Sequence, residues 1–478
     1  MLFNSIQFAV FFPVVTLLYF LLPHRLRWGL LLAASCLFYV AFIPAYILIL
    51  VVTISIDYAA AIWIENSAGA RRKYFLLVSI VSTCLVLLIF KYYNFFTVNT
   101  NAVARMLGWH YSIPLLNLIL PIGLSFHTFQ SLSYVIEVYR GAQKAERHFG
   151  IYSLYVMFYP QLVAGPIERP QNLLHQFREE KRFSYENLTQ GLELMAWGFF
   201  KKVVIADRLA LYTNEVYSSP LHYSASVLSL ATVAFAYQIY CDFSGYSDIA
   251  IGSARVMGFD LMKNFDVPYF SQSIGEFWRR WHISLSTWFR DYVYVPLGGS
   301  RVSRLCLYRN LMITFIVSGL WHGANWTFIV WGALNGTYLV AGECIKRIVP
   351  AWKGSRISAG GVTVRIARTL RTFALICLSW IFFRSNSVSD AWHILGRLAA
   401  DWSTGLHRVE AFSSFDAVVV ILAILALECV QILRATSDSI RAAWQWPVYV
   451  RWPAYYALLA SIVVFGVFER AQFIYFQF

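Results

Sequence analysis

The chain has 478 residues, of which 59% are hydrophobic and only 13% are charged, and its mean hydropathy is +0.56. Soluble domains carry about 25% charged residues, so this composition excludes an ordinary soluble protein and indicates a polytopic membrane protein. The formal net charge of +14 is typical of basic cytoplasmic loops. The absence of a Lys/Arg-rich tail with interleaved aromatic residues argues against nucleic acid binding.

Apolar segments long enough to span or re-enter a bilayer recur along the chain. A helical span needs about 20 residues. Several segments are shorter, as expected of re-entrant or broken helices that line a cavity. We expect about ten to thirteen membrane segments in all. The segments are Ser5–Leu22, Trp28–Ile43, Tyr46–Ile64, Tyr74–Phe96, Leu115–Tyr134, Ile151–Val163, Leu192–Ile205, Val227–Tyr240, Leu311–Val340, Thr372–Phe383, Val418–Leu433 and Ala454–Val467.

These segments predict an all-α polytopic membrane protein that forms a single integral-membrane domain over residues 1–478. The motifs with candidate chemistry fall between residues 120 and 345, and further spans are expected between residues 372 and 470. The N-terminus has no basic region and no small-residue cleavage site, so we expect a retained first span. The seven cysteines are scattered and have no zinc-ligand spacing, so neither a metal site nor a disulfide framework is predicted.

One histidine lies in the middle of a long apolar segment. His322 belongs to the run Ser318-Gly-Leu-Trp-His-Gly-Ala-Asn-Trp326 within Leu311–Val340. An ionisable side chain at membrane depth costs roughly 2.5–3.5 kcal/mol unless it faces a polar cavity, so it favours a functional role. The alternative is a core histidine bonded to a backbone carbonyl.

A second polar region precedes this segment. Within Glu276–Asp291, tryptophan and leucine residues recur at helical spacing, which predicts an amphipathic helix with Arg279, Arg280 and His282 on its other faces. Two interpretations are open for the arginines. They either extend to lipid phosphate at the interface, or bind an anionic ligand that enters from the cytoplasm, since Arg suits bidentate phosphate contacts.

The two histidines suggest acid–base chemistry without a metal. Neutral imidazole is a common general base near pH 7. Neither His282 nor His322 has metal-ligand spacing to another His, Cys or carboxylate, and no HExxH or GxSxG motif occurs. A buried histidine beside an anion site suits base-assisted transfer from a phosphate-bearing donor.

Five motifs together resemble the membrane-bound O-acyltransferase (MBOAT) family, in particular its alginate O-acetyltransferase (AlgI-type) branch. They are Met1–Ser5, Pro160–Pro170, Tyr240–Asp248, Phe277–Pro296 and Gly319–Gly323. The resemblance implies a helical bundle with re-entrant segments around a central tunnel or funnel. It also implies a multi-pass protein of the bacterial inner membrane.

The resemblance further implies that His322 is the catalytic histidine and His282 the second active-site histidine. The expected donor is acetyl-CoA, with no permanently bound cofactor. The acceptor would be an extracytoplasmic polysaccharide, reached with help from a periplasmic or membrane-anchored acetyltransferase partner.

A thioester is already activated, so the protein need only remove a proton from the attacking hydroxyl and stabilise the oxyanion. His322 is the candidate base, while Asn325, the Trp321 indole N–H or His282 are candidate oxyanion donors. Asp242 would orient His282 or line the cavity, or it would cap a helix end or have a structural role.

The remaining candidate site residues are arginines. Alternatives remain open for the acceptor of the acyl group and for the class of protein. Arg279, Arg280 and Arg290 would guide the CoA phosphates. Within the family, peptidoglycan, cellulose or a D-alanyl pathway are alternative acceptors. A transporter that uses the broken segments and buried His and Asp residues is the alternative of a different class.

Overall fold

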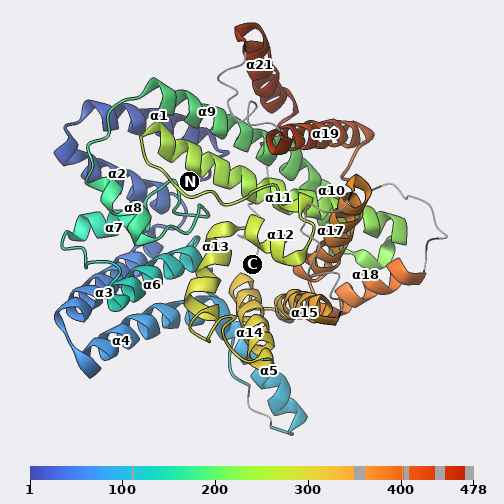
Figure 1. Cartoon of the computed structure of the whole chain (residues 1–478), viewed down its shortest axis with the longest axis horizontal. Helices are drawn as coiled ribbons and strands as arrows, with labels where there is room; N and C mark the ends of the chain where they lie inside the picture. The colour runs from blue at the N-terminus through green and yellow to red at the C-terminus, as the bar shows by residue number, and fades with distance from the viewer. Residues whose placement is uncertain (110–111, 349–360, 401, 403–408, 437–446, 469–478) are drawn as a thin grey trace. The chain divides into compact units, whose positions relative to one another are not determined.

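The computed structural model describes residues 1–109, 112–348, 361–400, 402, 409–436 and 447–468, and in these residues every regular element is a helix (Figure 1). The prediction of an all-α fold is therefore confirmed. The predicted C-terminal spans, residues 372–470, include 437–446 and 469–470, which lie outside the described residues. The chain divides into two compact units. The prediction of a single integral-membrane domain stays a prediction.

Seven helices among the described residues are long and apolar enough to cross a membrane, which makes this a multi-pass membrane protein. This number is below the ten to thirteen segments expected from the sequence. Several predicted segments form helices that are too short to span: Ser5–Leu22 becomes a helix of 16 residues, Ile6–Leu21, and Ile151–Val163 one of 9 residues, Phe149–Met157. Such lengths fit re-entry better than crossing.

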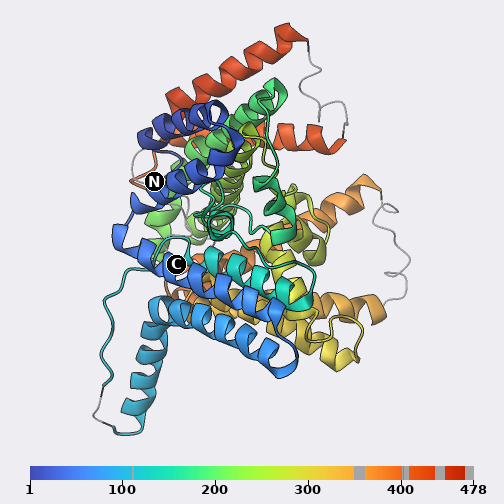
Figure 2. The same ribbon diagram turned by 90° about the vertical axis from the view of Figure 1, so that its left-hand side faces the viewer.

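The first unit comprises Met1–Met195 and Ala250–Met262. Its α3 and α4 lie side by side, and both pack against α6 (Figure 2). Two helices, α9 (Tyr185–Phe199) and α11 (Ala225–Val256), contribute residues to both units. The other helices of this unit are α1 (Ile6–Leu21), α2 (His24–Val40), α3 (Ile47–Asn66), α4 (Gly69–Leu87), α5 (Tyr93–Met106), α6 (Leu124–Arg140), α7 (Phe149–Met157) and α8 (Pro170–Leu173).

The predicted segment Leu115–Tyr134 is only partly helical, because α6 begins at Leu124. The residues before it are extended and run back along α5 (Figure 2). Asn94 exchanges two hydrogen bonds with the backbone of Leu116, and Asn101 does the same with Ile113. These side chains satisfy backbone groups that a helix would have paired internally, so hydropathy alone misplaced the start of the helix.

The second unit comprises Ala196–Ile249 and Lys263–Phe478. Its helices are α10 (Asp207–Ser218), α12 (Ile274–Arg280), α13 (Ile283–Phe289), α14 (Arg304–His322), α15 (Trp326–Ile348), α17 (Val362–Arg384), α18 (Val388–Ala400), α19 (Ser414–Thr436) and α21 (Val448–Phe465). Two π-helical turns, η4 (Phe200–Ala206) and η7 (Arg290–Tyr294), extend α9 and α13.

The apolar segment Leu311–Val340 is broken into the hairpin α14–α15, whose helices lie side by side (Figure 1). Glycines permit this close approach. A Cβ at Gly319 would lie 2.2 Å from the Phe328 carbonyl oxygen, and one at Gly332 would lie 2.3 Å from that of Phe315. Small residues that let backbones touch are a common basis of helix packing in membranes.

A buried aromatic cluster packs beside this hairpin. The Trp331 and Trp380 rings stack with centroids 6.1 Å apart, and Trp281 lies 5.2 Å from Trp380. Phe277 stacks on Trp281 at 5.4 Å. Large rings in mutual contact resist rearrangement because interiors are closely packed. The cluster therefore supports the residues between α12 and α13 from one side.

Candidate functional site

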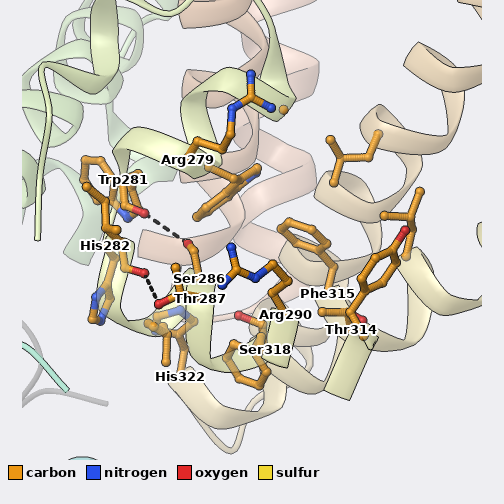
Figure 3. A pocket seen from close by; sticks show the side chains of 18 residues that line it. Arg279, Trp281, His282, Ser286, Thr287, Arg290, Thr314, Phe315, Ser318 and His322 are labelled. Atoms are coloured by element: carbon orange, nitrogen blue, oxygen red, sulfur yellow. Dashed lines mark hydrogen bonds between the residues drawn. The ribbon is translucent and has the colours of Figure 1, made fainter. Parts of the chain in front are cut away.

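A cavity of about 530 Å³ lies in the second unit, within the size range of small-molecule sites. Its lining comes from α12, α13, η7, α14 and α15 (Figure 3). Both candidate histidines contribute to it. The polar and charged lining residues are Arg279, His282, Ser286, Thr287, Arg290, Tyr294, Thr314, Ser318 and His322.

His322 is the last residue of α14, at the closed end of the hairpin. It is buried, and its ring contacts three aromatic side chains, with centroids 5.0 Å from Trp321, 5.0 Å from Trp331 and 5.2 Å from Phe383. A Cβ at Gly323 would lie 2.1 Å from the Phe328 ring, so only glycine fits after the histidine. The histidine is thus held at a helix end that faces the cavity.

His282 lies at a break that the sequence did not reveal. The predicted single helix is two short ones, α12 and α13, and His282 between them has the left-handed backbone conformation φ 43°, ψ 57°. Such a conformation costs a non-glycine residue roughly 1–3 kcal/mol. Backbone hydrogen bonds from Ile283 to Asn264 and from Asp266 to Arg280, both 2.8 Å, hold the chain on either side.

The His282 ring is fully buried among aromatic and polar groups. Its centroid lies 4.5 Å from Phe243 and 6.4 Å from Trp321. Nδ1 lies 3.1 Å from the side-chain oxygen of Asn264. His282 lies outside the helices of spanning length, and burial lowers its pKa well below the ordinary value. The imidazole is therefore neutral near pH 7.

Two of the three candidate arginines line the cavity and the third does not. Arg279 and Arg290 line the cavity, with Arg279 at the top of the view in Figure 3 and the two histidines at its lower left. Arg290 also contacts Asp291, Nε to Oδ1 2.8 Å. Arg280 instead pairs with Glu276 one turn earlier, 2.7 Å apart, and is not part of the lining.

Asp242 does not line the cavity either. It pairs with the buried ammonium group of Lys202 at 2.6 Å, and Lys202 also binds Asp207 at 2.7 Å. The neighbouring Lys201 pairs with Asp248 at 2.7 Å. Asp242 therefore belongs to a buried ion-pair cluster between η4 and α11, which corresponds to the structural role weighed from the sequence and not to a place in the cavity.

Trp321 and Asn325 flank His322 in sequence but lie outside the lining. Trp321 is buried against the His282 ring. The side-chain oxygen of Asn325 accepts the Thr327 N–H at 3.1 Å at the start of α15, and its amide nitrogen donates to the Asn386 carbonyl at 3.1 Å. The first contact is that of a helix N-cap, and the second joins the start of α15 to the residues after α17.

Other polar residues of the site carried little signal in the sequence. Ser286, Thr287 and Ser318 line the cavity, yet serine and threonine are common in any helix. Asn264 contacts His282, and its place in a polar segment just before Pro268 was the one available hint. No group of three or more His, Cys, Asp or Glu side chains that could hold a metal occurs among the residues described.

Comparison with known proteins gives the family. The profile of the MBOAT, membrane-bound O-acyltransferase family matches residues 146–380. The chain is 38% identical to the probable alginate O-acetylase AlgI of Azotobacter vinelandii over 436 residues, 89% of this chain and 84% of that protein. It is 34% identical to the peptidoglycan O-acetyltransferase of Helicobacter pylori over 428 residues, 83% of this chain and 79% of that protein.

A more distant relative extends the range of acyl groups. The chain is 28% identical to the teichoic acid D-alanyltransferase of Streptococcus thermophilus over 291 residues, 57% of this chain and 69% of that protein. The long matches at 34–38% identity confirm the resemblance seen in the motifs. An acyltransferase also differs in class from the transporter considered above. The chain belongs to the membrane-bound O-acyltransferase family.

Proposed function

We propose that this enzyme moves acetyl groups from cytoplasmic acetyl-CoA toward a hydroxyl of an extracytoplasmic, alginate-type polysaccharide, in the bacterial inner membrane. One observation carries the proposal: two histidines and two arginines line a single cavity, namely His282, His322, Arg279 and Arg290. The 38% identity to an alginate O-acetylase supports the acceptor class. The 34% identity to a peptidoglycan O-acetyltransferase makes peptidoglycan the second candidate acceptor.

The chemistry follows from the groups in the cavity. His322, as the base, takes the proton of the acceptor hydroxyl while its oxygen attacks the thioester carbonyl carbon. The tetrahedral intermediate then collapses, the C–S bond breaks, and the CoA thiolate leaves and takes up the proton from His322. Arg279 and Arg290 pair with CoA phosphates, because guanidinium groups match phosphate oxygens bidentately. A periplasmic partner acetyltransferase would pass the acetyl group to the polymer.

The test is a substitution of His322 in cells whose sole copy of the enzyme is the variant. General base assistance is worth about 10²–10⁴-fold, so His322→Ala should abolish measurable acetyl ester on the secreted polymer at wild-type protein level. Purified protein in vesicles with radiolabelled acetyl-CoA gives the same comparison in vitro. The control is His175→Ala, because His175 is exposed in the first unit, where its Nε2 lies 3.8 Å from the exposed Glu179.

The outcomes separate the parts of the proposal. Wild-type acetylation by a well-expressed His322→Ala variant would refute the assignment of the base. Acetyl ester on peptidoglycan in place of the secreted polysaccharide would replace the acceptor and leave the base unchanged. Failure to consume acetyl-CoA, with transfer from another acyl donor, would refute the donor.

A further inference from the structure

A buried asparagine holds the backbone just after His282 and one edge of the His282 ring. The Asn264 side chain is 1% exposed. Its Oδ1 accepts the Ser284 backbone N–H at 3.2 Å and the Ser284 hydroxyl at 2.9 Å, and it lies 3.1 Å from His282 Nδ1. Its Nδ2 donates to the Ser247 hydroxyl at 3.1 Å. The Asn264 backbone carbonyl also accepts the Ile283 N–H.

The orientation of this amide follows from its partners. Oxygen and nitrogen of an asparagine are distinguished only by what they bond. The Ser284 backbone N–H can only donate, so the atom that faces it must be the acceptor, Oδ1. The Ser247 hydroxyl can accept from Nδ2. Reversal of the amide would set two donors against each other in a buried place, which costs about 1–3 kcal/mol.

The fixed amide in turn determines the proton of the imidazole. Oδ1 only accepts, so a bond at 3.1 Å requires a hydrogen on His282 Nδ1. The Ser284 hydroxyl also lies near Nδ1, at 3.4 Å, and it donates at shorter range to Asn264. A neutral imidazole carries a single N–H, so its Nε2 carries the lone pair.

We infer that Asn264 is a positioning residue that keeps neutral His282 in the Nδ1–H tautomer, so that Nε2 serves acetyl transfer as a hydrogen-bond or proton acceptor. The inference rests on the proposed function, which places His282 in the active site. It also removes a role: the one N–H of neutral His282 is bonded to Asn264, so this ring does not donate to the oxyanion. That donor must come from another group near the cavity, such as an indole N–H or a hydroxyl.

The direct test reads the tautomer by ¹⁵N NMR. The full-length protein is labelled with ¹⁵N-histidine, placed in nanodiscs near pH 7, and the His282 signals are identified by their loss in His282→Gln. Protonated and unprotonated ring nitrogens have widely separated shifts. We expect a protonated Nδ1 and an unprotonated Nε2. A protonated Nε2 with a bare Nδ1, or a doubly protonated ring, would overturn the inference.

Variants test whether the tautomer matters for turnover. Asn264→Leu keeps the approximate side-chain volume but removes the hydrogen-bond acceptor beside Nδ1. In metal sites, mutation of the partner that fixes a histidine tautomer typically costs about 10–100-fold in metal affinity or activity. We expect a fall in kcat of about that size. Asn264→Asp keeps an acceptor beside Nδ1, so it should keep the Nδ1–H signal and restore much of the rate. An Asp variant as inactive as the Leu variant, at equal protein level, contradicts the inference.

The control is another buried asparagine in the same unit. Asn310 donates to the backbone carbonyls of Leu297 and Gly299, and neither contact involves a histidine. Asn310→Leu should lower stability but leave the His282 signals unchanged. Because the NMR measurement uses no acetyl-CoA, the two proposals fail separately. Full activity in His322→Ala would refute the assignment of His322 as the base but would not affect the inference about the His282 tautomer. An unprotonated Nδ1 would refute the positioning role of Asn264 but would not affect the dependence of activity on His322.

Discussion

The sharpest test of how the fold holds the site is Gly319→Ala, one turn before His322 in α14. The added Cβ would lie 2.2 Å from the Phe328 carbonyl oxygen of α15, whereas ordinary contact begins at about 3.4 Å. The two backbones must therefore separate by about 1.2 Å. The obstacle is main chain and cannot rotate away, so we expect the upper end of the usual overpacking cost, about 3 kcal/mol.

The same displacement should reach the chemistry. His322 is on α14, while Trp331, whose ring centroid lies 5.0 Å from it, is on α15. A misplacement of about 1 Å in an active site can cost about 100-fold in rate. We expect Gly319→Ala to lower the thermal unfolding midpoint in detergent, and to lower acetyl transfer per folded molecule by about that factor.

The matched control lies on the partner helix. A Cβ at Gly342 in α15 would meet no atom within 4 Å. Gly342→Ala should therefore keep full activity and gain up to about 1 kcal/mol from helix propensity. Both variants are compared by midpoint and by transfer rate at equal protein level. If Gly319→Ala matches the wild type in both measurements, the close backbone contact does not hold the hairpin as described.

Three further changes test other parts of the structure. Lys202→Met removes the ammonium group that bridges two buried carboxylates. The free energy of unfolding should therefore fall by about 3–5 kcal/mol, and an unchanged midpoint of thermal unfolding would contradict this. Arg279→Ala should raise the KM for acetyl-CoA by about 10- to 100-fold, the worth of a charged hydrogen bond, whereas Arg280→Ala, outside the cavity, should not. Burial raises the pKa of Glu168 to about 7 from its ordinary 4.5, so the folded protein keeps a proton that the unfolded chain releases. Stability should then fall as pH rises between those values, and midpoints measured across this range should vary less in Glu168→Gln.

Hydropathy predicted most spans because a single property decides them. The segment Tyr46–Ile64 is α3 within a few residues, and Thr372–Phe383 is the core of α17. Apolar residues without charges must be helical in a bilayer, where each backbone group needs an internal partner. Where side chains supply those partners, as Asn94 and Asn101 do beside the extended residues before α6, the rule no longer applies.

The helix breaks were harder to predict, and for two different reasons. The break between α14 and α15 has a local signal, since Gly323 and Asn325 are residues typical of helix ends. The break at His282 has no such signal. Its neighbours fit a continuous amphipathic helix, and the left-handed backbone depends on Asn264, which is distant in sequence and reaches it through tertiary hydrogen bonds.

Among the charged candidate residues, too, one had a partner that the sequence could predict and one did not. Arg280 could have been set aside from the sequence, because Glu276 stands four residues before it, at the spacing of a helical ion pair. The partner of Asp242 could not. Lys202 reaches it because the end of α9, which leads into η4, packs closely against α11: a Cβ at Gly198 in α9 would lie 2.6 Å from the Gly245 carbonyl oxygen.

The chemistry of the cavity is concentrated where helices end. His322 closes α14, His282 separates α12 from α13, and Arg290 begins the π-helical turn η7. In the middle of a membrane helix a side chain meets lipid or a neighbouring helix. At a break, backbone groups need polar partners, and those partners bring donors and acceptors into the apolar interior. Asn264 illustrates this: the same side chain satisfies the backbone at the start of α13 and orients the imidazole. A break that must be stabilised in any case thus becomes the place where a histidine of the candidate site is held.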